Sequence, residues 1–93
     1  MFGRRSGPDP ELVRAAAEAW TKVDALEAAA RAYAQRWGVP VDKIGRFTGL
    51  MAEWTGSKDA RRAVILVGFK LIEESDVLDV VFREGQPVEV EIH

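Results

Sequence analysis

The first third of the chain carries apolar residues at alternating spacings of four and three. Asp9, Pro10 and Glu11 predict a helix start, because they supply a cap, a fixed first turn and a negative charge at the positive end of the dipole. Gly38 and Pro40 predict the end of this helical region. The apolar positions form one stripe of the kind that a helix buries, and they are Leu12, Ala16, Ala19, Val23, Leu26, Ala30, Tyr33 and Trp37.

Residues 10–37 are compatible with one helix or with two. A single helix over this span would be about 42 Å long, because each residue adds 1.5 Å. That is longer than a domain of 93 residues needs, so the pattern indicates either a break or a partner. Thr21 and Asp24 are candidate caps for a second helix, and Asp24 is followed by Glu27 as in a capping box.

A further helix is predicted from residues 41–42 to Trp54. Gly45 and Gly49 lie within it, and each costs a helix about 1 kcal/mol relative to alanine. The polar cluster at 55–59 then interrupts the pattern. The prediction depends on the helical spacing of five apolar residues, which are Ile44, Phe47, Leu50, Met51 and Trp54.

The remaining chain favours strands. The apolar run at 63–69 suits a central strand or a buried helix, and its β-branched residues favour the strand for 62–74. Residues 78–83 and 88–93 alternate in polarity on either side of a turn at 84–87, as in a hairpin. We therefore expect a flexible N-terminal arm, residues 1–8, and one α+β domain, residues 9–93. In that domain two or three N-terminal helices pack on a C-terminal antiparallel sheet of two or three strands.

Composition narrows the range of chemistry. The chain has no cysteine and one histidine, which argues against disulfides, thiolate chemistry and a zinc site, and we expect no cofactor. The apolar run at 63–69 is too short to span a membrane, and the start of the chain lacks the apolar core of a signal peptide. These features favour a cytoplasmic location with no membrane partner.

The charges are unevenly distributed although the formal net charge is only −2. Residues 31–62 carry seven Lys and Arg against three Asp and Glu, whereas residues 71–93 carry one Arg against seven Asp and Glu. A basic middle and an acidic tail can pair between subunits or simply face solvent.

Residues 30–49 resemble the helix-turn-helix pattern. Ala34, Gly38, Val39, Ile44 and Phe47 have its spacing of small, turn and apolar positions. Helices followed by a hairpin also resemble the winged-helix proteins of the bacterial regulator type. The resemblance implies a recognition helix that binds duplex DNA, with Lys43 and Arg46 as contacts and Arg4 and Arg5 as an arm. Its outward positions, however, would be Val41, Gly45 and Gly49, which cannot hydrogen-bond to bases through their side chains.

We favour instead a small non-enzymatic protein-interaction module that forms a homodimer and binds a further protein partner. The long apolar stripe and the three tryptophans are more than one small domain readily covers, and tryptophans are frequent anchors in interfaces. The predicted interface residues are Leu12, Trp20, Val23, Trp37 and Trp54.

An enzyme or small-ligand site is the alternative of another class. Asp76 and Asp79 lie beside or within the apolar hairpin, where burial could make one of them a general base. No nucleophile elbow, phosphate-binding glycine loop or metal-ligand spacing accompanies them, so we name no catalytic residue.

Overall fold

A computed structural model describes residues 10–56, 62–73 and 76–93 of the chain. The predicted arm at 1–8 and the capping residue Asp9 lie outside the described residues. The elements are helices α1 (Pro10–Trp20) and α2 (Val23–Trp37), the 3-10 turn η1 (Val41–Lys43), and strands β1 (Ile44–Thr55), β2 (Arg62–Leu71), β3 (Val77–Arg83) and β4 (Gln86–Ile92).

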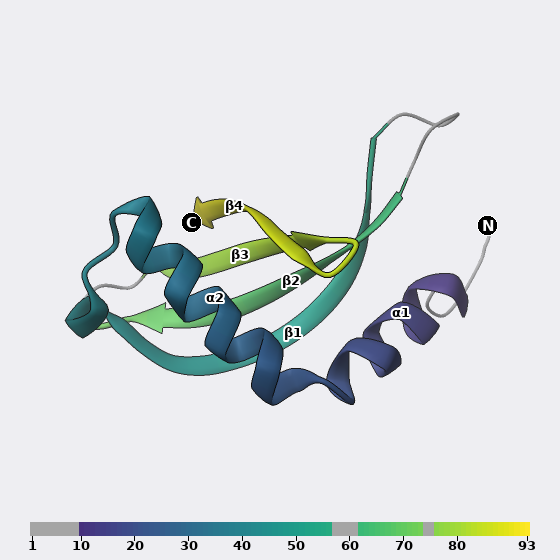
Figure 1. The fold of residues 1–93 in the computed structure, drawn as a ribbon, viewed down its shortest axis with the longest axis horizontal. Coiled ribbons are helices and arrows are strands. Elements are labelled where there is room, and N and C mark those ends of the chain that lie inside the picture. Colours follow the sequence, from purple (N-terminus) through teal and green to yellow (C-terminus); the bar gives the residue numbers. More distant parts are fainter. Residues whose placement is uncertain (1–9, 57–61, 74–75) are drawn as a thin grey trace, which may run out of the picture.

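The four strands form one antiparallel sheet in the order β1-β2-β3-β4. Both helices lie over the same face of this sheet (Figure 1), with α1 against β1 and β2 and α2 against β2, β3 and β4. The α+β arrangement is confirmed, with four strands rather than two or three. The strand favoured for 62–74 is present as β2, and the predicted hairpin is present as β3 and β4, joined at Glu84 and Gly85.

Residues 10–37 form two helices, which break at Thr21 and Lys22. The predicted caps are wrong: the Thr21 hydroxyl donates to the carbonyl of Glu18 at 2.6 Å, and the cap position is Lys22, which makes no side-chain capping bond. The break changes the direction of the chain (Figure 1), so that α1 covers β1 and β2 while α2 covers β2, β3 and β4. One apolar stripe is thereby spread over the whole width of the sheet.

Helix α2 ends at Gly38, as the sequence predicts. Gly38 has a φ of 118°, in the left-handed region that favours glycine. Its N–H donates to the carbonyl of Gln35 at 3.1 Å, and the N–H of Val39 donates to the carbonyl of Ala34 at 3.0 Å. This pair of bonds is a Schellman motif, which satisfies the carbonyls at the helix end and turns the chain toward η1 and β1.

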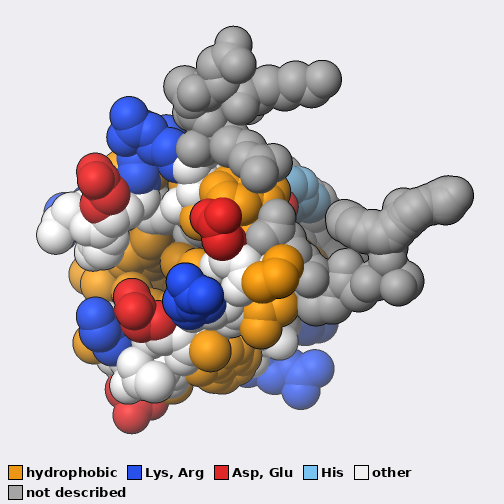
Figure 2. All heavy atoms as spheres, turned by 90° about the vertical axis from the view of Figure 1, so that its right-hand side faces the viewer, with side chains coloured by type: hydrophobic (Ala, Val, Ile, Leu, Met, Phe, Trp, Pro, Cys, Tyr) orange, Lys and Arg blue, Asp and Glu red, His pale blue; other side chains and the backbone are white. Residues whose placement is uncertain are grey.

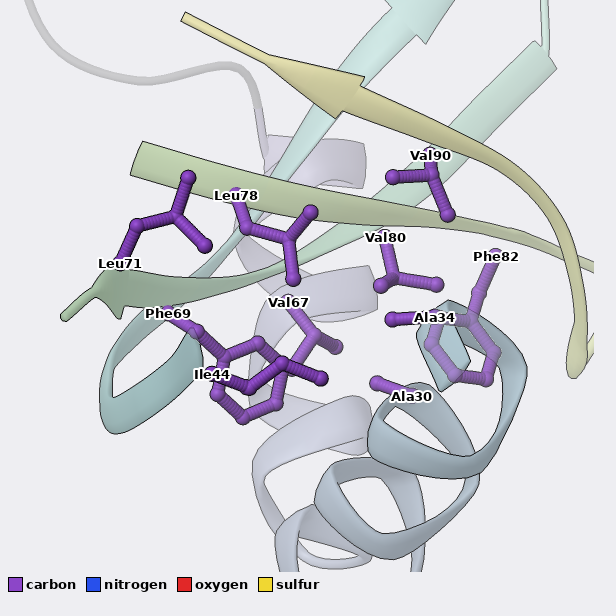
Figure 3. Packing of buried hydrophobic residues seen from close by; sticks show 10 residues of the cluster. All are labelled: Ala30, Ala34, Ile44, Val67, Phe69, Leu71, Leu78, Val80, Phe82 and Val90. Atoms are coloured by element: carbon purple, nitrogen blue, oxygen red, sulfur yellow. The ribbon is translucent and has the colours of Figure 1, made fainter. Parts of the chain in front are cut away.

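The main core lies between α2 and the sheet (Figure 3). Ala30 and Ala34 are fully buried, and they face a layer of strand residues that includes Val67, Val80 and Phe82. Because an alanine side chain is only a methyl group, the helix backbone approaches the sheet closely. The other buried members of this cluster are Ile44, Phe69, Leu71, Leu78 and Val90.

The helix predicted for 41–54 is wrong, because this segment is the turn η1 followed by strand β1. Two irregularities in the pairing of β1 with β2 explain the error. Ile44 pairs with Leu71 and Phe47 with Phe69, so β1 holds one extra residue there, and the step from Phe47 to Gly49 adds another. Such bulges shift the alternation of a strand.

As a consequence, the residues of β1 that join the helix-side core are Ile44, Phe47 and Leu50, three residues apart. That spacing resembles one face of a helix, although the backbone is extended. The glycines that weakened the helix prediction are the better guide to this segment. An ideal Cβ on Gly45 would lie 2.5 Å from the carbonyl oxygen of Lys70 on the neighbouring strand, so only glycine allows this approach.

The close approach of α2 predicts that Ala30→Leu is strongly destabilising. Extra methyl groups in this fully buried position have to push α2 off the sheet, and overpacking of this kind costs about 1–3 kcal/mol. Ala29→Leu is the matched control, because Ala29 is exposed on the same helix. Urea unfolding followed by circular dichroism measures both variants, and equal stability of the two would contradict this packing.

The contact at Gly45 predicts that Gly45→Ala lowers the free energy of unfolding by about 1–3 kcal/mol, because backbone must move to admit the methyl group. Gly68→Ala is the comparison. There the nearest atoms are the tips of two side chains, Asp79 Oδ1 at 2.9 Å and Thr48 Oγ1 at 3.0 Å, which can rotate away. We expect the Gly45 variant to be the less stable of the two in urea, and the reverse order would be evidence against the bulged path of β1.

Candidate interaction surface

An apolar groove lies at the end of the molecule where α2 terminates. Its volume is about 320 Å³. The elements that form it are the end of α2, the turn that leads to η1, and the ends of β2 and β4. We call it the Trp37 groove, and its lining residues are Trp37, Gly38, Val39, Pro40, Lys43, Leu71 and Ile92.

The exposure of the lining side chains distinguishes this groove from the core. Leu71 is 4% exposed, whereas Trp37 is 56% and Ile92 is 49% exposed. Trp37 is three residues beyond Ala34 on α2 and continues its apolar stripe. The helix ends there, so the indole lies at the margin of the core. The groove therefore presents two large apolar side chains to solvent beside a buried apolar residue.

The polar groups around the Trp37 groove are few. Among the described residues, Lys43 is its only charged lining residue, and the guanidinium of the adjacent Arg36 lies 5.8 Å from the ring of Tyr33. Asp42 is exposed in the same turn as Lys43, so this end of the molecule carries both signs of charge. A groove lined mainly by apolar side chains and one cation is suited to apolar contact rather than to acid–base chemistry.

The five predicted interface residues do not form one surface. Leu12 and Trp20 lie on α1, and Val23 begins α2. The ring of Trp20 meets Phe47 edge-on at 5.8 Å between centroids, and Phe47 meets Phe69 in the same way at 6.1 Å. Trp20 thus completes a row of aromatic rings between α1 and the sheet, although 46% of its surface stays exposed.

Trp54 is half-buried on β1, opposite Ala63, and so belongs to the same end of the sheet as α1. Of the predicted set, Trp37 alone lines the groove. Sequence reasoning missed Val39, Leu71 and Ile92. Val39 follows the helix-ending Gly38 directly and could have been found from that position. Leu71 and Ile92 reach the groove only through the order of the strands.

The predicted DNA contacts do not lie on the recognition helix that was expected. Lys43 is in η1 and lines the Trp37 groove, and Arg46 is an exposed residue of β1, whereas Arg4 and Arg5 lie outside the described residues. The turn at Gly38 leads into η1 and β1, so the recognition helix implied by the helix-turn-helix resemblance is absent from 41–54. Binding of duplex DNA by any other surface stays a prediction.

The end of the molecule that carries α1 is also not a uniformly basic surface. Figure 2 shows Lys and Arg side chains interspersed with Asp, Glu and hydrophobic side chains over the described part of this end. A surface that follows the phosphates of a duplex usually groups its cations. The described side chains in this view are mixed in sign, so this end shows no such grouping of cations.

The two carboxylates considered for catalysis lie on or beside the face of the sheet away from the helices. Asp79 Oδ2 is 3.1 Å from His93 Nε2, and the Asp79 side chain is 20% exposed. Glu91 Oε1 is 3.6 Å from the same nitrogen, and Asp76 is half-buried before β3. In the parts of the chain that the structure describes, no group of three or more acidic or histidine side chains is arranged to hold a metal ion.

The backbone of His93 is hydrogen-bonded to the sheet. It exchanges two backbone hydrogen bonds with Val77, at 3.0 and 2.9 Å, and so extends the pairing of β4 with β3. The contact between the Asp79 carboxylate and the His93 imidazole adds to this anchor. These contacts account for Asp79 and His93 as part of the pairing of β4 with β3.

No helix within residues 10–56, 62–73 and 76–93 is long and apolar enough to cross a membrane. Comparisons with protein-family models, with curated proteins and with solved structures find no match to the chain.

Proposed function

We propose that the protein is a non-enzymatic interaction module that forms a homodimer through the Trp37 groove. The observation that supports this most directly is the half-exposed indole of Trp37 beside the exposed Ile92. Tryptophan is the side chain most enriched among residues that dominate binding energy, especially beside a well-packed pocket.

The shape of the groove favours a second copy as its occupant. In a twofold interface the same patch meets itself, so it must offer both a projecting group and a recess. The Trp37 ring projects beside the recess floored by Leu71, and a twofold axis near this point would place each ring against the other copy's Leu71 and Ile92. The neighbouring Asp42 and Lys43 have opposite signs, which avoids a field of like charges between the copies.

A dimer also compensates for the small size of the core. A chain of this length buries only about 60–65% of its unfolded surface, so the folded monomer is modestly stable. Association of folded copies adds stability by mass action. Covering the Trp37 groove would remove from water the two exposed apolar side chains that the fold itself leaves at this end.

Trp37→Ala tests the proposal. We expect the wild type to sediment as a dimer at high micromolar concentration, and we expect this variant to weaken dimerisation at least tenfold, because loss of a central anchor typically costs about 2 kcal/mol or more. Analytical ultracentrifugation over a dilution series measures the change.

Trp20→Ala is the matched control, since it removes the same side chain at a similar exposure from the other end of the fold. It loses the contact with Phe47 and should unfold at lower urea concentration while dimerising like the wild type. A wild type that remains monomeric at high micromolar concentration refutes the homodimer. A Trp37 variant that dimerises normally refutes the role of the groove.

A further inference from the structure

The face of the sheet opposite the helices carries a second apolar cluster. Val64, Leu66 and Val81 form it and are 3%, 6% and 8% exposed. Both helices contact the other face, where Ile65 and Phe82 meet α1 and α2. The second cluster therefore lies on a face that no described helix covers (Figure 1).

This cluster is the floor of a trough of about 250 Å³ between the two outer strands. β1 contributes Glu53 and Thr55 to one wall, and β4 contributes Val88, Glu89 and Glu91 to the other. In the register of the sheet, Met51, Leu66, Val81 and Glu89 follow one another across the four strands. β1 bends along its length (Figure 1), and Glu53 and Thr55 of this strand line the trough.

The charge of the trough is mainly acidic. Its walls carry Glu53, Glu89 and Glu91, and Arg83 is the one basic residue among the described side chains that line it. Within the described parts of the chain, neither Glu53 nor Glu89 is in an ion pair, whereas Glu91 shares His93 with Asp79. Because the three floor side chains are at most 8% exposed, the acidic walls supply most of the accessible surface of the trough. These walls are complementary to a segment that carries cations on both sides of a narrow apolar stripe.

The width of the sheet indicates the shape of that segment. β1 and β4 are separated by three strand spacings, which is about 14 Å along the sheet. An α-helix with its side chains is about 10–12 Å across, so one helix fills the space between the two walls. Lys and Arg on either flank of its apolar stripe could then reach Glu53 on one side and Glu89 on the other.

We propose that the open face of the sheet binds an amphipathic helix of a partner protein, with an apolar stripe flanked on both sides by Lys or Arg. The helices of this chain do not meet that description, because their stripe is already packed on the opposite face. The site is separate from the Trp37 groove and does not depend on homodimerisation.

The test uses the full chain and a synthetic helical peptide about five turns long, with leucines along one stripe and lysines on both flanks. Its matched control has glutamate in place of every lysine. In an NMR titration we expect the lysine peptide to shift the methyl signals of Val64, Leu66 and Val81 and to bind with a dissociation constant below about 1 mM. The glutamate peptide should leave these signals unchanged.

Charge reversal then locates the binding. The double variant Glu53→Lys with Glu89→Lys should lower the affinity for the lysine peptide at least tenfold. The control double variant Glu18→Lys with Asp24→Lys makes the same change in net charge on the helices and should have little effect on that affinity. Circular dichroism checks that both variants fold. Trp37→Ala should leave peptide binding unchanged, which separates this proposal from the homodimer.

Three results would overturn the inference. One is the absence of methyl shifts with the lysine peptide, and another is equal weakening by the two double variants, which would indicate non-specific charge attraction. The third is a change in the monomer–dimer equilibrium on reversal of Glu53 and Glu89 without peptide binding by the wild type. That result would mean that a second copy occupies the trough.

Discussion

The close packing of α2 on the sheet restricts the positions of the elements before and after it in the chain. Ala30 and Ala34 are fully buried against strand residues that are themselves almost completely buried, among them Val67 and Val80 (Figure 3). Side chains this small let the helix backbone lie near the strands, and the contact loses area or gains strain if either partner changes size. With α2 in this position, the path of the chain on both sides of it is restricted.

This packing has two consequences for the surfaces. The Schellman turn at Gly38 directs the chain from the end of α2 into η1 and β1, and it leaves Trp37 at the margin of the core beside Leu71 and Ile92. At the other end, the break at Thr21 and Lys22 lets α1 cover β1 and β2. Both helices therefore pack on one face of the sheet. The opposite face carries a small apolar cluster between acidic walls.

The three tryptophans illustrate how differently one residue type is used in this fold. Trp20 meets Phe47 edge-on and so helps to attach α1 to the sheet, whereas Trp54 is half-buried on β1. Trp37 has comparable exposure to Trp20 but lies beside a groove instead of a row of rings. A count of tryptophans indicates an apolar excess, and only their surroundings separate packing from interface.

The sequence alone determines the features that depend on residues close together in the chain. These are the helix start near Pro10, the end of the second helix at Gly38, the strand at 62–71, and the hairpin. These features follow from local chemistry and from the alternation of buried and exposed positions. The path of β1 depends instead on its pairing with β2, because two bulges place Ile44, Phe47 and Leu50 inward at a spacing that mimics a helix. The Trp37 groove and the acidic trough likewise depend on the assembled sheet. The order of the strands, and not sequence proximity, places Leu71 and Ile92 at one end of the sheet and puts Glu53 and Glu89 on its two outer strands.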